Sequence, residues 1–249
     1  MSTLREALAV GEREVVAFVG AGGKTSAMFR LARELRASGA GVVVTTTTRV
    51  RVPTDDDVRV IVGALAELRR GIAAAGDGIP VVAAAETDDG KLAGIGPEAV
   101  GVVAAFPGVT HVLVEADGAA GRPIKAPREG EPVIPDAATL VVAVVGVDAL
   151  GQTVGSVAHR PERVMALTGL GRDDALDARS IARVMVGADG VTRGTPSRAR
   201  VAALVNKADD AVRAERARRI AGELLRAGAA LVVVTSLERP GAVVDVIRR

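Results

Sequence analysis

Short runs of apolar, mostly β-branched residues alternate along this chain with stretches in which apolar residues recur at helical spacing. The apolar runs predict strands at residues 14–19, 41–44, 58–62, 79–84, 111–115, 140–145, 201–205 and 231–234. The helical patterns predict helices at residues 24–37, 64–75, 97–105, 175–186 and 209–227. Nearly continuous apolar strands that alternate with helices are typical of βα units on a mostly parallel sheet covered on both faces.

We therefore expect an α/β protein with a three-layer fold similar to that of P-loop nucleoside triphosphatases, built around a mostly parallel central sheet. The 249 residues suffice for a single domain, with a small helical insertion at about residues 147–198. Residues 118–136 are rich in Gly and Pro and show no period, which predicts a long ordered loop. Long loops inside a domain are usually functional.

The composition argues against several classes of partner. Aromatic residues make up 1% of the chain, and acidic and basic residues are interspersed with a net charge of only +2, so neither base stacking nor a basic stripe is available for nucleic acid. No apolar stretch approaches the ~20 residues of a membrane span, and residues 1–10 lack the apolar core of a signal peptide. Cysteine is absent, which excludes thiolate metal sites. We expect a cytoplasmic protein without a nucleic-acid or membrane partner.

Two residue types are rare in this chain. Asn206 is the only asparagine, and there are four lysines against 28 arginines. Lys207 follows Asn206, and Lys24 ends a glycine loop. A chain that otherwise avoids Asn and Lys thus keeps them where a nucleotide-binding protein contacts base and phosphate.

The glycine loop joins the first predicted strand to the first predicted helix. Its residues are Gly20, Ala21, Gly22, Gly23, Lys24, Thr25 and Ser26. Such a loop points backbone N–H groups at an anion, the helix N-terminus adds a positive dipole end, Lys24 reaches the β- and γ-phosphates, and the Thr25 hydroxyl binds Mg²⁺. The loop is two residues shorter than the standard P-loop, has Phe18 where the first Gly usually stands, and is similar to the loops of Mur ligases. The alternative is a glycine turn that caps an ordinary helix.

Two carboxylates, Glu115 and Asp117, end a predicted buried strand. Because α/β sheets bind ligands at the carboxyl ends of their strands, one carboxylate could bind Mg²⁺ and the other could orient an attacking water. Lys24, Glu115 and Asp117 are therefore the candidate catalytic groups, and Thr25, Glu115 and Asp117 the candidate Mg²⁺ ligands. Glu115 and Gly118 also resemble the Glu-x-x-Gly element of hydrogenase- and urease-maturation GTPases. The alternative is a solvated polar strand end.

The tetrad at residues 206–209 fits the Asn-Lys-x-Asp guanine motif of GTPases. In that motif the Asp209 carboxylate accepts hydrogen bonds from guanine N1–H and the 2-amino group, which adenine lacks, and the Lys207 stem covers the base. Ser236 follows the next strand, where GTPases place a serine loop against guanine. Asn206, Lys207, Asp209 and Ser236 are thus candidate nucleotide-binding residues, although Asp209 and Asp210 could simply cap the next helix.

A weaker pattern suggests a second, anionic substrate. Arg122 and Lys125 lie in the long loop, and His159 and Arg160 lie in the expected insertion. Basic side chains at these places could contact an anion, but a solvated loop explains Arg122 and Lys125 about as well. A structural role is the better explanation of His159, although His159 and Arg160 could face the site.

Taken together, the motifs resemble the YqeC family of selenium-dependent hydroxylase accessory, or selenium cofactor biosynthesis, proteins. The resemblance rests on residues 19–26, 45–48, 115–118, 122–127 and 131–135. One departure is Gly130, which stands where the family pattern has a His. The resemblance implies a partner among molybdenum- or selenium-containing hydroxylases or their maturation machinery.

Three hypotheses about function follow. The first is a Mg²⁺-dependent nucleoside triphosphatase, using GTP, that assists maturation of such a hydroxylase cofactor. The second is an ATP-dependent ligase or transferase acting on an anionic cofactor precursor. The third is a nucleotide-gated carrier or adaptor without turnover.

Overall fold

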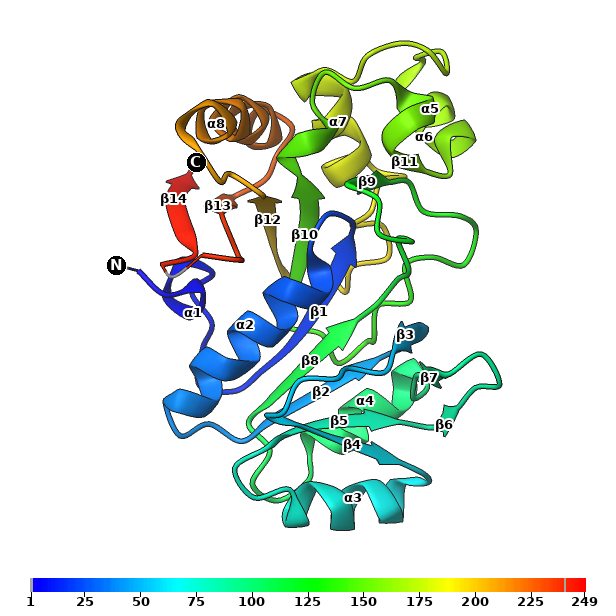
Figure 1. The fold of residues 1–249 in the computed structure, drawn as a ribbon, viewed down its shortest axis with the longest axis vertical. Coiled ribbons are helices and arrows are strands. Elements are labelled where there is room, and N and C mark those ends of the chain that lie inside the picture. Colours follow the sequence, from blue (N-terminus) through cyan, green and yellow to red (C-terminus); the bar gives the residue numbers. More distant parts are fainter. Residues whose placement is uncertain (1, 240) are drawn as a thin grey trace.

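Strand β1 (Glu14–Gly20) runs through the interior of a nine-stranded sheet in the computed structural model, which describes residues 2–239 and 241–249 (Figure 1). The strand order is β14-β13-β12-β10-β1-β8-β2-β5-β4. The remaining strands are β2 (Val42–Thr46), β4 (Val58–Val62), β5 (Ile79–Ala83), β8 (His111–Glu115), β10 (Leu140–Gly146), β12 (Arg200–Asn206), β13 (Leu231–Thr235) and β14 (Val243–Arg248). Every neighbouring pair is parallel except β13 and β14, so the predicted mostly parallel α/β sheet is confirmed.

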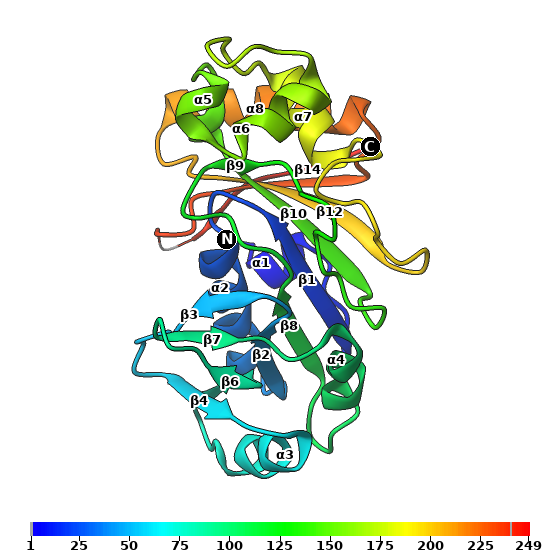
Figure 2. The same cartoon turned by 90° about the vertical axis from the view of Figure 1, so that its right-hand side faces the viewer.

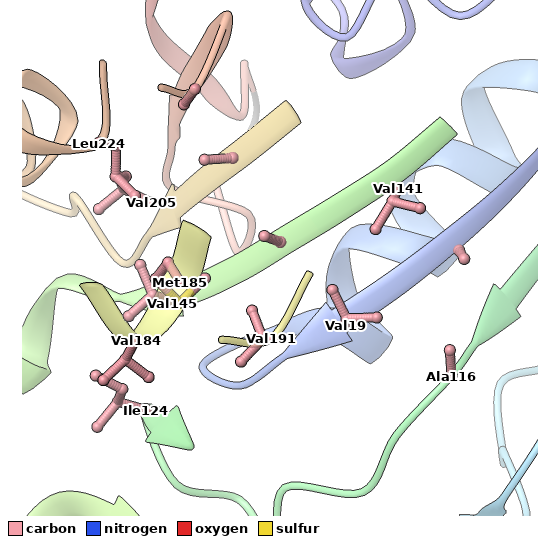
Figure 3. Close-up of a cluster of buried hydrophobic side chains, with 14 of the residues drawn as sticks. Val19, Ala116, Ile124, Val141, Val145, Val184, Met185, Val191, Val205 and Leu224 are labelled. Carbon is pink, nitrogen blue, oxygen red and sulfur yellow. The ribbon is translucent and has the colours of Figure 1, made fainter. Parts of the chain in front are cut away.

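Helices cover both faces of this sheet. Strand β1 sends alternate side chains to opposite faces, and each set packs in a different buried cluster. Val16 and Phe18 belong to a buried cluster with α1 (Leu4–Ala7) and α2 (Lys24–Ala37). Val15, Ala17 and Val19 belong to a second cluster, on the other face, whose helices include α3 (Leu65–Ala74), α4 (Pro97–Ala104), α7 (Ala178–Val186) and α8 (Ala211–Arg226). Figure 3 shows part of this second cluster, and Figure 2 shows the layers from the side. The predicted three-layer fold is confirmed.

Two smaller assemblies lie at the carboxyl edge of the sheet. Strands β3 (Arg49–Arg51), β7 (Lys91–Ala93) and β6 (Ala85–Glu86) form an antiparallel sheet beside β2 and β5 (Figure 1). The segment between β10 and β12 contains η1 (Val147–Ala149), α5 (Val154–Val157), β11 (Ala158–His159), α6 (Pro161–Thr168) and α7. Strand β11 pairs with β9 (Ile124–Lys125), which is the only strand among residues 118–136. Within the described ranges, no helix has the length and apolar character needed to cross a membrane.

The predicted strands and helices are all present, with ends shifted by a few residues. Helix α7 begins at Ala178 because the Asp177 side chain accepts a hydrogen bond from Ser180 N, and α8 begins at Ala211 because Asp210 caps it in the same way. Strand β14 was not predicted. Its side chains are only partly buried, so its sequence lacks the continuous apolar run of the interior strands.

Candidate functional site

The predicted nucleotide motifs meet at the carboxyl edge of the sheet. The glycine loop follows β1, Glu115 ends the neighbouring β8, and Asn206 ends β12, which lies two strands from β1 on the other side. Strands β8 and β10 flank β1 and are reached by different crossovers, so the loop stands where the strand order reverses. Open α/β sheets bind ligands in the crevice at such a point.

The glycine loop is packed so tightly that its three glycines exclude a side chain. Gly20 has φ +92, and a Cβ there would lie 2.4 Å from Val144 O. Gly22 has φ +78, and a Cβ there would lie 2.2 Å from Gly146 N at the end of β10. Gly23 has φ +131, and a Cβ there would lie 2.3 Å from Asn206 Nδ2. The Asn206 amide donates to Gly22 O at 3.0 Å, while its Oδ1 accepts from Thr235 Oγ1 and Leu237 N. The Asn206 side chain therefore holds the loop in place, and it does so by both donating and accepting hydrogen bonds.

Lys24 brings a buried positive charge to the centre of this loop. Its side chain is 4% exposed, and Nζ donates to Gly20 O at 2.8 Å. The same Nζ lies 3.2 Å from Asp117 Oδ1 and 3.8 Å from Glu115 Oε1. Asp117 is fully buried and also accepts from Gly20 N at 3.0 Å. The two carboxylates thus offset the charge of Lys24, and Asp117 ties β8 to the loop.

Thr25 and Glu115 form a pair of oxygen donors beside Lys24. The Thr25 hydroxyl donates to Glu115 Oε2 at 2.7 Å, and both residues line the cavity described below. Among the described residues, no group of three or more His, Cys, Asp or Glu side chains is placed to hold a metal ion by itself. Mg²⁺ usually takes one or two protein oxygens and completes its shell with phosphate and water, so this donor pair fits it. Asp117 is predicted by sequence as a third ligand, but it lies behind the loop and does not line the cavity.

The tetrad lies on the other side of the loop, where Asp209 and Lys207 each have polar partners. Ser236 Oγ donates to Asp209 Oδ1 at 2.7 Å, and Arg213 donates to Asp209 Oδ2 at 2.9 Å. Lys207 Nζ lies 2.6 Å from Asp148 Oδ2, and the Lys207 backbone adopts φ +68, a conformation that L residues rarely take. Asp210, and not Asp209, accepts the capping bond of α8. Helix capping therefore does not account for Asp209.

A buried ion network lies behind the loop. Lys125 is fully buried and pairs with Asp117 Oδ2 at 3.1 Å and Glu131 Oε2 at 2.8 Å, and it donates to Gly118 O. Arg160 donates two bonds to Glu131, at 2.6 and 3.0 Å. Burial by itself raises the pKa of Glu131, but the bonds and charges of Arg160 and Lys125 outweigh it and hold this pKa at about 2. The network links β8 and the loop at 118–136 to the segment that begins α6.

Glu131→Gln is expected to lower the free energy of unfolding by about 3–5 kcal/mol at neutral pH, because it leaves buried positive charge uncompensated. Since the folded-state pKa lies below the ordinary value of 4.5, the contribution of Glu131 is complete above pH 4.5 and is lost as the pH falls toward 2. Denaturant unfolding of both proteins should show this difference shrinking over that window. Glu129→Gln, which changes an exposed glutamate two positions away, is the matched control. A constant difference down to pH 2 would contradict the assignment.

A cavity of about 800 Å³ opens beside the loop. Lys24, Thr25, Glu115 and Arg122 line it, and it extends over β2 and β5 to the small sheet β3-β7-β6. Arg122 also donates to Ser156 O at 2.6 Å.

The other residues predicted for a second substrate do not line this cavity. These are Lys125 and Arg160, which are committed to Glu131, and His159. Burial, with the positive charges of Arg160 and Lys125, lowers the pKa of His159, so this imidazole is neutral at pH 7.

Several residues of this site were missed from the sequence. Lys91 is the remaining lysine, and it lines the cavity with Lys24 and Lys207, so the scarcity of lysine that singled out those two would have found it. Glu131 lies within a motif of the family resemblance. Asp148 follows an ordinary strand end, and only the folded structure shows that it pairs with Lys207.

The mostly parallel three-layer sheet, with a glycine loop leading from an interior strand into a helix that begins with Lys-Thr, defines an α/β protein of the P-loop type. The family model described as "YqeC protein" matches residues 16–162, which is more than half of the chain. An Escherichia coli (strain K12) protein named "Uncharacterized protein YqeC" is 34% identical over 197 residues, covering 78% of this chain and 75% of that protein. The chain belongs to the YqeC family. The family-model match includes the glycine loop and the carboxylates and ends before the tetrad.

Proposed function

We propose that this protein binds a Mg²⁺–nucleoside triphosphate, with GTP as the preferred nucleotide, and hydrolyses it slowly. The observation that carries the proposal is the direct bond from the Asn206 amide to Gly22 O, because it joins the base-reading tetrad to the phosphate loop. One molecule that engages both motifs must carry a base and phosphates. The scarcity of Asn and Lys elsewhere in the chain supports the same conclusion.

In this proposal the N–H groups at the start of α2 and Lys24 bind the phosphates, since the N–H groups of Gly20, Ala21 and Gly22 already donate to Asp117, Val144 O and Arg122 O. Asp209 and Ser236 contact guanine. Thr25 and Glu115 hold Mg²⁺, which would offset charge that develops on the phosphates. Asp117 and Lys125 act as positioning residues, since they hold β8 against the loop. Arg122 is the basic side chain of the long loop that lies at the cavity wall beside the site.

The biological role in this proposal is assistance in maturing the cofactor of a selenium- or molybdenum-containing hydroxylase. It rests on the resemblance of the sequence motifs to selenium-dependent hydroxylase accessory proteins. Nucleotide turnover would then be coupled to a client enzyme. In such a site the client enzyme, on docking, would supply the positive group that stabilises the charge developing on the phosphate.

Thr25→Val is expected to raise the Mg²⁺ concentration needed for half-maximal phosphate release from GTP by about tenfold, because it removes one oxygen ligand. Thr25→Ser keeps the hydroxyl and should restore the wild-type requirement. The measurement is inorganic phosphate released against Mg²⁺ concentration for the three proteins. An identical Mg²⁺ dependence in all of them would remove Thr25 from the metal site.

A second candidate function is transfer to an anionic acceptor. The cavity supports it, since about 800 Å³ beside the loop gives room for a second substrate. Phosphate release that depends on an added anionic acceptor would favour this function over simple hydrolysis.

A further inference from the structure

The cavity reaches Lys207 of the tetrad but extends mainly to the other side of the phosphate loop. Its floor includes Val44, Thr45, Val81 and Val82 of β2 and β5, whereas Asp209 and Ser236 lie beyond β10 on the opposite side of β1. A nucleotide with its base at Asp209 would extend its phosphates across the loop toward Glu115. The cavity then continues past the terminal phosphate, and the nucleotide does not fill it.

Most of the charged side chains on the cavity wall are basic. Six basic side chains and two acidic ones line it, although the whole chain carries a net charge of only +2. Both acids are already paired, Glu115 with Lys24 and Asp55 with Arg33 at 2.9 Å. Lys24, Lys91 and Lys207 also have carboxylate partners. Among the described residues, the excess of positive charge on the wall therefore rests mainly on Arg49, Arg51 and Arg122.

Part of that excess sits on the small sheet, remote from the loop. Arg51 of β3 stands directly opposite Lys91 of β7, and Arg49 shares its face of β3. Like charges placed directly across two strands destabilise the pairing. Among the described residues, no carboxylate lies within 4.0 Å of the guanidinium groups of Arg49 and Arg51, and Lys91 pairs only with the exposed Asp89. An anion between these side chains would relieve the repulsion.

Part of the cavity lining is apolar: Met28, Phe29, Val50, Val52 and Leu92. Val50 and Leu92 alternate with the basic residues along β3 and β7, so they lie on the other face of the small sheet from Arg51 and Lys91. An organic anion held by the basic side chains would extend its body along the cavity to these apolar walls, from which a hydrated inorganic ion would gain nothing.

From these observations we infer that Arg49, Arg51 and Lys91 form the binding subsite for a second substrate, a small organic phosphate or carboxylate with an apolar body. The inference rests on the proposed function in one respect: the anion is taken to bind beside a nucleotide on the loop. It differs from the sequence prediction, which assigned this role to Arg122, Lys125, His159 and Arg160.

The test is calorimetric titration of phenyl phosphate, and separately of benzoate, into the full chain saturated with Mg-GDP. The double variant Arg51→Gln/Lys91→Gln is expected to weaken binding of the preferred anion about tenfold or more, since it removes two charge-assisted contacts. Arg219→Gln, which removes an exposed arginine of α8, should bind as the wild type does. Preference for phenyl phosphate would identify a phosphate, and preference for benzoate a carboxylate.

Binding of neither anion, or equal affinity in the wild type and the double variant, would overturn the inference. A separate titration of Mg-GTP into the double variant keeps this failure distinct from failure of the proposed function. Nucleotide affinity there should be within about threefold of wild type, because neither side chain contacts the loop. If no nucleotide binds any of the proteins, phenyl phosphate and benzoate are titrated into the nucleotide-free chain. Weaker binding by the double variant than by the wild type would then support the subsite, and equal binding would overturn it.

Discussion

Replacing Lys24 by Ala should weaken binding of Mg-GTP by about 100-fold or more, because charge-assisted bonds to phosphate are worth roughly 3 kcal/mol. In the free protein this amino group donates to Gly20 O and faces Asp117, beside the start of α2. Arg30→Ala removes a positive charge from the same helix, where it pairs with Glu34, and should leave nucleotide affinity unchanged.

Calorimetry of the three proteins measures the effect, and circular dichroism checks that Lys24→Ala remains folded. The Asp117 carboxylate keeps Lys125 and Gly20 N as partners in this variant, so the core of the site is retained. Equal affinity of Lys24→Ala and the wild type for Mg-GTP would show that the glycine loop does not bind the phosphates.

Asp209→Asn is expected to change the base preference of the protein. A carboxylate accepts from guanine N1–H and the 2-amino group, whereas an amide can donate to the 2-oxo group of xanthine. The affinity for GTP should fall about 100-fold, and xanthosine triphosphate should become the better ligand, because a site that hydrogen-bonds a ligand donor rejects a partner that leaves its polar groups unpaired.

Asp210→Asn is a closely matched control. It makes the same change one residue away, and Asn also caps helices well, so α8 should be preserved. Competition of GTP and xanthosine triphosphate for a fluorescent guanine nucleotide measures the preference. If Asp209→Asn keeps its selectivity for GTP while Asp210→Asn behaves as the wild type, the tetrad does not contact the base.

Much of the fold could be predicted because its interior strands are continuous apolar runs that both helical layers cover. Helix α2 begins and ends at the predicted residues, Lys24 and Ala37. The small sheet β3-β7-β6 was not predicted, since strands of two or three residues are too short to show a period. Strand β14 depends on antiparallel pairing with β13, which local sequence does not encode.

In the candidate site, too, local features could be predicted and contacts between distant elements could not. Residues within one motif, such as Lys24 and Thr25, could be predicted together because the loop that holds them is local. The bond from Asn206 to Gly22 and the pairing of Lys125 with Glu131 join different elements, so they depend on how the strands are ordered. The cavity could not be predicted at all, since its far wall comes from β3 and β7.

The central claim is that this chain binds a guanine nucleotide through the loop at residues 20–26 and the tetrad at residues 206–209. Calorimetric titration of the wild-type protein with Mg-GTP and with Mg-ATP tests it most directly. The account predicts binding of Mg-GTP, with an affinity at least about 100-fold above that for Mg-ATP. Equal or tighter binding of Mg-ATP would contradict guanine recognition by Asp209, and binding of neither nucleotide would contradict the claim as a whole.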